Sequence, residues 1–102
     1  MKFGVGISLY NPSKESLDYI KSLTNFFSAI YIYDNTKNNN EYLEYIDKTF
    51  VYSYTGENRG LSKGFNWFID KANSDKLDYL LILDQDSCYD VEKLQKLMNV
   101  IE

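Results

Sequence analysis

Two aspartates separated by a single residue, Asp84 and Asp86, are the side chains of this sequence with the clearest potential for chemistry. They follow directly on the apolar run 80–83, which is long enough for a buried strand. Because an unpaired carboxylate is costly to bury, we expect both side chains at the exit of that strand, at its carboxyl end. Two close carboxylates there indicate a site for a divalent cation, Mg²⁺ or Mn²⁺, and the cation indicates a phosphorylated ligand.

The Asp84–Asp86 pair also has other interpretations. The chain contains 15 acidic residues, so this spacing can arise by chance, and Asp86 could simply cap a following helix. A phosphoryl-transfer enzyme would use Asp84 as nucleophile and Asp86 as acid or base, but such enzymes usually carry the pair on an early strand. The position after a buried strand favours the metal interpretation.

Polar residues also follow the first two predicted strands. Tyr10 and Asn11 come after the first strand, and Asp34 and Asn35 come after the second. Asp34 and Asn35 are typical turn residues, and a carboxylate at that place could equally accept hydrogen bonds from a nucleobase or ribose. Both interpretations stay open for Asp34.

A fourth polar segment, residues 58–66, combines glycines, cations and amides at a predicted helix start. One interpretation is a turn and a helix cap, with Gly64 allowing close packing. The other is that main-chain N–H groups, Arg59 or Lys63 face a phosphate or a sugar. The spacing of a Walker A loop is missing.

The elements that position these segments follow from hydrophobic periodicity. Residues 3–9 alternate, with large side chains on one face and Gly or Ser on the other, which predicts a strand whose small face admits a close helix. Further strands are predicted at 29–33, 50–54 and 77–83, and helices at 12–27, 41–48, 61–72 and 91–101, the first beginning at Pro12 with Asn11 as its cap.

This alternation predicts an α/β, Rossmann-like, mainly parallel sheet of about four strands with helices on both faces, in one domain covering residues 1–102. Parallel strands share one carboxyl edge, so the four polar segments should converge there.

Composition restricts the function classes. With 11 basic and 15 acidic residues, a net charge of −4 and no basic stripe, nucleic-acid binding is not expected. The absence of His excludes His-based catalysis within this sequence, and the single Cys88 excludes an internal disulfide. We expect a reducing, cytoplasmic compartment. No apolar run approaches the roughly 20 residues that span a bilayer, which leaves peripheral attachment at the inner face of the membrane open.

Four segments together resemble family 2 glycosyltransferases, most closely the bacterial rhamnosyltransferase-like branch. They are residues 9–12 (LYNP), 33–36 (YDNT), 58–66 (NRGLSKGFN) and 83–87 (LDQDS). The resemblance spans nearly the whole chain. It implies the N-terminal, donor-binding half of a GT-A fold and an inverting transfer. The donor would be a dTDP- or UDP-linked rhamnose-like sugar or other hexose, and the acceptor a hydroxyl of a glycan or lipid-linked molecule in cell-surface polysaccharide synthesis.

The resemblance also implies roles for individual residues. Donor-binding roles fall on Tyr10, Asn11, Asp34, Asn58, Gly60, Lys63, Asn66 and Asp84. Among these, Asp34 matches the carboxylate that contacts the base or ribose, and Lys63 lies near the diphosphate. The metal motif is Asp84 and Asp86, with Asp86 the principal ligand.

The sequence departs from the family pattern in two places. Its second strand ends in Asp-Asn-Thr, where many relatives have Asp-Asp-Gly-Ser. The chain also ends one helix after Asp86, and neither Asp90 nor Glu92 matches the general base of the family. We therefore expect the donor-binding half of a longer enzyme, which binds the donor without efficient transfer and exposes an apolar surface that favours homo-oligomers. The alternative is a non-catalytic or degenerate α/β interaction module.

Overall fold

The computed structural model describes residues 2–37, 41, 43–86 and 90–101. The elements run in the order β1 (Phe3–Leu9), α1 (Lys14–Ser22), a 3₁₀ turn η1 (Leu23–Asn25), β2 (Ala29–Asp34), a 3₁₀ turn η2 (Leu43–Tyr45), β3 (Val51–Tyr54), α2 (Leu61–Ser74), β4 (Tyr79–Leu83) and α3 (Val91–Ile101). Ser87, Cys88, the asparagine tract 38–40 and Tyr42 lie outside the described residues.

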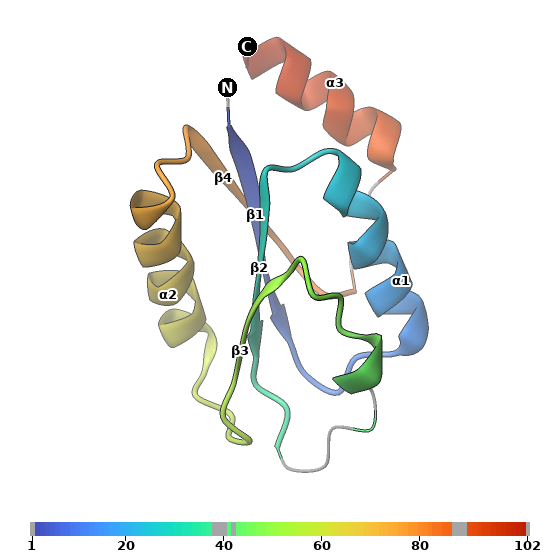
Figure 1. The fold of residues 1–102 in the computed structure, drawn as a ribbon, viewed down its shortest axis with the longest axis vertical. Coiled ribbons are helices and arrows are strands. Elements are labelled where there is room, and N and C mark those ends of the chain that lie inside the picture. Colours follow the sequence, from blue (N-terminus) through green and yellow to red (C-terminus); the bar gives the residue numbers. More distant parts are fainter. Residues whose placement is uncertain (1, 38–40, 42, 87–89, 102) are drawn as a thin grey trace.

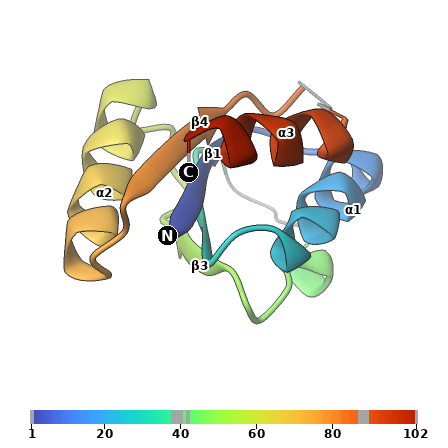
Figure 2. The ribbon, with the colours of Figure 1, turned by 90° about the horizontal axis from the view of Figure 1, so that it is seen from above.

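The four strands form one sheet in the order β3-β2-β1-β4, and every neighbouring pair is parallel. Ile7 in β1 is aligned with Ile32 of β2 on one side and with Leu83 of β4 on the other. Helices α1 and α3 cover one face of the sheet and α2 covers the other (Figure 1 and Figure 2). The predicted Rossmann-like α/β fold is therefore confirmed.

The two faces of β1 carry side chains of very different size. Phe3, Val5, Ile7 and Leu9 are buried in the main core, which also contains residues of α1 and α3. Gly4, Gly6 and Ser8 lie on the opposite face, where Gly6 is next to Phe68 and Ser8 is next to Gly64 of α2. A Cβ atom placed on Gly6 would lie only 2.7 Å from Cγ of Phe68. The small face therefore lets α2 approach the sheet closely, as the alternation of residues 3–9 predicts.

A smaller core lies between α2 and the sheet. It consists of the buried residues Tyr31, Tyr33, Phe68 and Ala72. The ring of Trp67 contacts three of these, with centroids 6.3 Å from Tyr31, 5.8 Å from Tyr33 and 5.8 Å from Phe68. This aromatic cluster fixes α2 against β2.

The end of α2 is fixed to β2 by a polar contact. The Tyr31 hydroxyl donates a hydrogen bond to Oδ2 of Asp75 at 2.6 Å. Burial raises the pKa of Tyr31 far above its ordinary value, and the hydrogen bond to Asp75 and the negative charge of Asp75 act in the same direction. The neutral phenol is therefore the form that the fold stabilises.

The predicted start of the first helix is wrong. Helix α1 begins at Lys14 rather than at Pro12, because Ser13 is its cap and the Ser13 hydroxyl accepts a hydrogen bond from the N–H of Ser16 at 3.1 Å. Asn11 is not the cap. It has a positive φ of 45°, which turns the chain before the helix.

Other boundaries also differ from the prediction. The first helix ends at Ser22 and is followed by the turn η1, so the buried Phe27 lies beyond it. Of the helix predicted at 41–48, the described residues contain only the turn η2. Strand β4 begins at Tyr79, because the N–H of Leu77 still bonds to the carbonyl of Ala72 at 3.0 Å.

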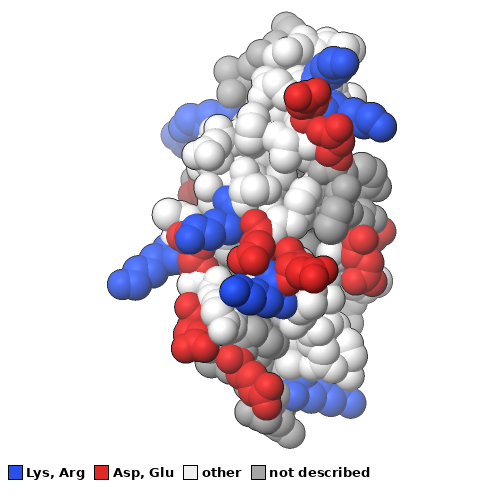
Figure 3. Space-filling view, turned by 90° about the vertical axis from the view of Figure 1, so that its right-hand side faces the viewer, with Lys and Arg blue, Asp and Glu red and all other residues white. Residues whose placement is uncertain are grey.

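The surface that carries α1 and α3 has charges of both signs. In Figure 3, the basic and acidic side chains of the described residues are interspersed on this face without an extended area of one sign. Among the described residues, no helix has the length and apolar character needed to cross a bilayer.

Candidate functional site

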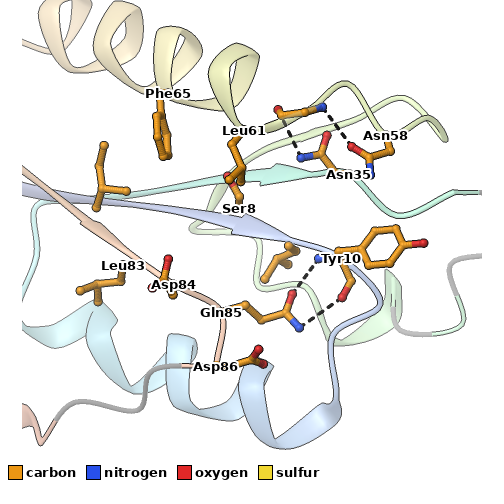
Figure 4. Close-up of a pocket in the computed structure, with 13 residues that line it drawn as sticks. Ser8, Tyr10, Asn35, Asn58, Leu61, Phe65, Leu83, Asp84, Gln85 and Asp86 are labelled. Carbon is orange, nitrogen blue, oxygen red and sulfur yellow. Dashed lines mark hydrogen bonds between the residues drawn. The ribbon is translucent and has the colours of Figure 1, made fainter.

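A pocket of about 620 Å³ opens at the carboxyl edge of the sheet (Figure 4). Its walls come from the ends of three strands, from the connection between β3 and α2, and from the first turns of α2. The lining residues are Ser8, Leu9, Tyr10, Asn35, Asn58, Gly60, Leu61, Phe65, Ile82, Leu83, Asp84, Gln85 and Asp86. All four polar segments that the sequence places at this edge contribute to the pocket.

The pocket lies where the strand order changes direction. Strand β1 is followed in the chain by β2 on one side of it, whereas β4 lies on its other side. At such a switch point the connections after the two neighbouring strands leave in different directions and open a crevice. The strand order thus explains why the pocket is bounded by the ends of β1 and β4.

Asp84 and Asp86 are exposed in the pocket wall, on either side of Gln85 (Figure 4). Neither carboxylate has an ion-pair or hydrogen-bond partner within the described part of the chain. Carboxylate oxygens are the ligands that Mg²⁺ and Mn²⁺ prefer. The described residues contain no cluster of three or more such side chains, so waters and ligand oxygens would have to complete the coordination. This donor set fits a cation that binds together with a diphosphate.

Gln85, between the two aspartates, connects β4 to β1. Its Oε1 accepts a hydrogen bond from the main-chain N–H of Tyr10 at 2.7 Å, and its Nε2 donates to the Tyr10 carbonyl at 3.2 Å. The pairing of the two strands ends at Ile7 and Leu83. The Gln85 amide therefore extends the contact between the strands beyond the end of the sheet.

Asn35 makes a similar contact on the opposite side of the pocket. Its Oδ1 accepts from the N–H of Arg59 at 3.0 Å, and its Nδ2 lies 3.5 Å from the carbonyl of Gly60, at the long limit of a hydrogen bond. Within the same loop, Oδ1 of Asn58 accepts from the N–H of Gly60 at 3.0 Å. These contacts hold the entry to α2 against the end of β2.

The first turn of α2 begins at the pocket without a side-chain cap. Gly60 occupies the cap position with φ 87°, a conformation that other residues rarely adopt, and provides no side-chain acceptor. The first N–H groups of a helix have no partner within the helix and carry partial positive charge. Leu61 and Phe65 extend from this turn as an apolar wall.

The charge of the pocket wall is negative. Among the described residues that line it, Asp84 and Asp86 are charged and none is Lys or Arg. Arg59 is close in sequence, but its Nη2 lies 3.7 Å from Oε2 of Glu57. An anionic ligand would therefore depend on the helix start and on a bound cation.

The family model for glycosyl transferase family 2 matches residues 5–102, which include the whole lining of this pocket. The chain belongs to glycosyl transferase family 2. No curated protein and no solved structure gives a match. At the level of the family, the pocket is therefore part of a glycosyltransferase domain.

Five of the residues that the family resemblance selects line the pocket of this family 2 chain: Tyr10, Asn58, Gly60, Asp84 and Asp86. Asn11 and Asp34 do not. The N–H of Asn11 donates to Oγ1 of Thr36 at 2.9 Å, away from the lining. Asp34 is only 2% exposed.

The Asp34 carboxylate is bonded within the protein. Its Oδ1 accepts from the N–H of Thr36 at 2.9 Å, and its Oδ2 accepts from the hydroxyl of Tyr52. In the structure Asp34 therefore forms a turn with Thr36, and Asn35 is the residue of this segment that lines the pocket. A contact of Asp34 with a base or ribose stays a prediction.

Lys63 and Asn66 are exposed on α2 and do not line the pocket. At 3.6 residues per turn, Lys63 lies about 200° and Asn66 about 140° around the helix from Leu61, the residue that faces the pocket. Neither side chain is therefore directed into this cavity from its position on the helix.

Several lining residues were not selected from the sequence. The helical spacing predicts Leu61 and Phe65 on the apolar face of a helix, but their exposures of 60% and 39% show that the sheet does not cover them. In the sequence Gln85 is only the residue between the two aspartates. A side-chain bond to the main chain of a residue 75 positions away leaves no pattern in a sequence. For Leu61 and Phe65, their place within the segment 58–66 could have indicated the pocket.

Proposed function

We propose that this chain binds the diphosphate of a nucleotide-sugar donor, with Mg²⁺ or Mn²⁺ held by Asp84 and Asp86. It would act as the donor-binding half of an inverting glycosyltransferase with a GT-A fold. The observation that carries the proposal is that the two carboxylates and the uncapped start of α2, at Gly60 and Leu61, line the same pocket.

The charges support a cation-dependent ligand. A diphosphate brings at least two negative charges to a wall that already contains Asp84 and Asp86. At about 4 Å each pair of like charges costs about 1 kcal/mol in water and about 4 kcal/mol at an effective dielectric constant near 20. A bound divalent cation would neutralise this repulsion and stabilise the negative charge of a departing diphosphate. The N–H groups at the start of α2 would bind a phosphate oxygen.

The sugar and its acceptor are proposed on the family resemblance. We propose a dTDP- or UDP-linked hexose of the rhamnose type, a glycan or lipid-linked acceptor hydroxyl, and a role in cell-surface polysaccharide synthesis on the cytoplasmic side of the membrane. Transfer needs a carboxylate to take the proton of the acceptor hydroxyl. Asp84 and Asp86 are the acidic groups among the described lining residues, and both are assigned to the cation. We therefore expect donor binding without efficient transfer by this chain.

Thermal melting tests the proposal directly. Mn²⁺ with UDP, dTDP or GDP at about 100 times its dissociation constant should stabilise the chain by about 2.7 kcal/mol, a shift of several degrees in a domain of this size. Asp86→Ala should abolish the part of the shift that needs Mn²⁺.

Asp70→Ala is the matched control, because Asp70 is an exposed carboxylate on α2 outside the pocket lining. It should retain the full shift. A shift that ignores Mn²⁺ or survives in Asp86→Ala would refute the cation site, and no shift with any nucleotide would favour the non-catalytic module. Release of phosphate from a simple phosphomonoester, lost in Asp84→Asn, would favour the phosphoryl-transfer alternative.

A further inference from the structure

We infer that Gln85 is a positioning residue for the cation site: its amide fixes the Asp84–Asp86 segment to the end of β1, so that both carboxylates are held at the pocket. The inference rests on the proposed function, because it assigns Gln85 a role in cation-dependent binding. The observation behind it is the pair of hydrogen bonds between the Gln85 side chain and the main chain of Tyr10, at 2.7 and 3.2 Å.

The contact replaces a missing part of the sheet. Strands β1 and β4 pair regularly from Phe3 and Tyr79 up to Ile7 and Leu83. The chain then leaves the strand, and residues 85 and 86 form a turn. A strand that continued straight would keep the two carboxylates in the sheet, whereas an untethered turn would leave them mobile in water. By bonding both the N–H and the carbonyl of Tyr10, the Gln85 amide substitutes for a main-chain peptide and holds the turn in place.

Both partners of this contact belong to the pocket. Tyr10 and Gln85 line it together with the two aspartates (Figure 4). The exposed side chains of Asp84 and Asp86 have no ion-pair or hydrogen-bond partner among the described residues to orient them. Their placement therefore depends on the main chain of the segment that carries them, and Gln85 is the side chain that fixes that segment.

Gln85→Ala separates geometry from charge. It removes both hydrogen bonds to Tyr10 and leaves the charge of the pocket wall unchanged. If the two aspartates attracted the cation through charge alone, Mn²⁺ would bind equally well to this variant. If Gln85 is needed to position the two carboxylates, the Mn²⁺ affinity of Gln85→Ala in the presence of UDP should fall about tenfold or more. Such a loss is typical when a group that orients metal ligands is removed.

Gln95→Ala is the matched control. It also removes a glutamine side chain that forms a hydrogen bond, from Nε2 to Oδ1 of Asn99 at 3.2 Å, but on α3 and outside the pocket lining. Two quantities should be measured in the 102-residue chain and both variants. One is the Mn²⁺ dependence of UDP binding by calorimetry, and the other is hydrogen exchange of the Tyr10 amide by NMR.

The expected result is faster exchange at Tyr10 and weaker Mn²⁺-dependent binding in Gln85→Ala, with Gln95→Ala like the wild type. Faster exchange with unchanged Mn²⁺ affinity would overturn the positioning role and leave Gln85 a structural contact. Unchanged exchange would overturn the contact itself. If the wild-type protein shows no Mn²⁺-dependent UDP binding, the proposed function fails and this inference fails with it. If the wild type binds and Gln85→Ala binds Mn²⁺ equally well, only the inference about Gln85 fails.

Discussion

The Asp34 carboxylate lies buried at the end of β2, where it accepts hydrogen bonds from the main chain of Thr36 and from the hydroxyl of Tyr52. Tyr52 is on β3, the neighbouring strand. The carboxylate therefore links two parallel strands near their carboxyl ends. An acidic residue after a strand can bind a ligand or can link two strands in this way. The neighbouring residues in the sequence do not distinguish these two roles. The burial of Asp34 favours the link, and burial depends on the tertiary structure, which the sequence neighbours do not reveal.

Tyr52→Phe tests this link at the level of one residue. It removes the hydroxyl donor, so the buried Asp34 carboxylate loses a partner and the free energy of unfolding should fall by about 1–3 kcal/mol. Urea denaturation measures the change. Tyr54→Phe is the control, because the Tyr54 ring stacks on that of Tyr52 with centroids 6.4 Å apart and lies on the same strand. It should change stability by less than about 0.5 kcal/mol, and an equal loss in both variants would contradict the role of the hydroxyl.

At the level of elements, the approach of α2 to the sheet depends on the small face of β1. A Cβ on Gly6 would lie 2.7 Å from Cγ and 2.8 Å from Cδ2 of Phe68, whose side chain is fully buried. The Phe68 ring is enclosed by the core and has little room to move. The contact between α2 and β1 thus requires the absence of a side chain at position 6.

Gly6→Ala should therefore destabilise the protein by about 1–3 kcal/mol through overpacking, which urea denaturation can measure. Gly4→Ala is the comparison. Its Cβ would lie 2.3 Å from Cδ1 of Leu77, but this atom ends a flexible, half-buried side chain that can turn aside. The loss should be smaller at position 4, and the reverse order would show that Phe68 is free to move.

The alternation in residues 3–9 predicted both faces of β1 correctly, because the period of a strand is visible over a few residues. The start of α1 was missed for a local reason. Asn11, Pro12 and Ser13 all suit a helix start by composition. The positive φ of Asn11 and its hydrogen bond to Thr36, 25 positions away, decide between them.

At the scale of the whole molecule, the parallel topology made the position of the pocket predictable. Once strands and helices alternate, the carboxyl ends of the strands must lie at one edge, and Tyr10, Asn58 and Asp84 all reach it. The orientation of individual side chains was not predictable in the same way. Lys63 and Asn66 lie in a motif that reaches the pocket, but the helical phase places them elsewhere on α2.

The charge of the molecule leads to a prediction about salt. The net charge is −4, and the described lining of the pocket has no Lys or Arg. Without a divalent cation, UDP affinity should not decrease as ionic strength rises past about 0.1 M, because salt screens repulsion. Titrations with a fluorescent UDP analogue in chelator at low and high salt measure this. A steep fall in UDP affinity with salt would show that Lys or Arg side chains bind the diphosphate. The variant Lys63→Ala would then show whether Lys63 is responsible.

The position of the single tryptophan determines what intrinsic emission can report. Trp67 lies among the rings of Tyr31, Tyr33 and Phe68, between α2 and the sheet, and is not part of the pocket lining. Its emission should therefore change strongly when α2 separates from β2 during denaturation. Filling of the pocket should leave it nearly constant, so a fluorescence signal for ligand occupancy will need a dye attached near Tyr10 or a labelled nucleotide.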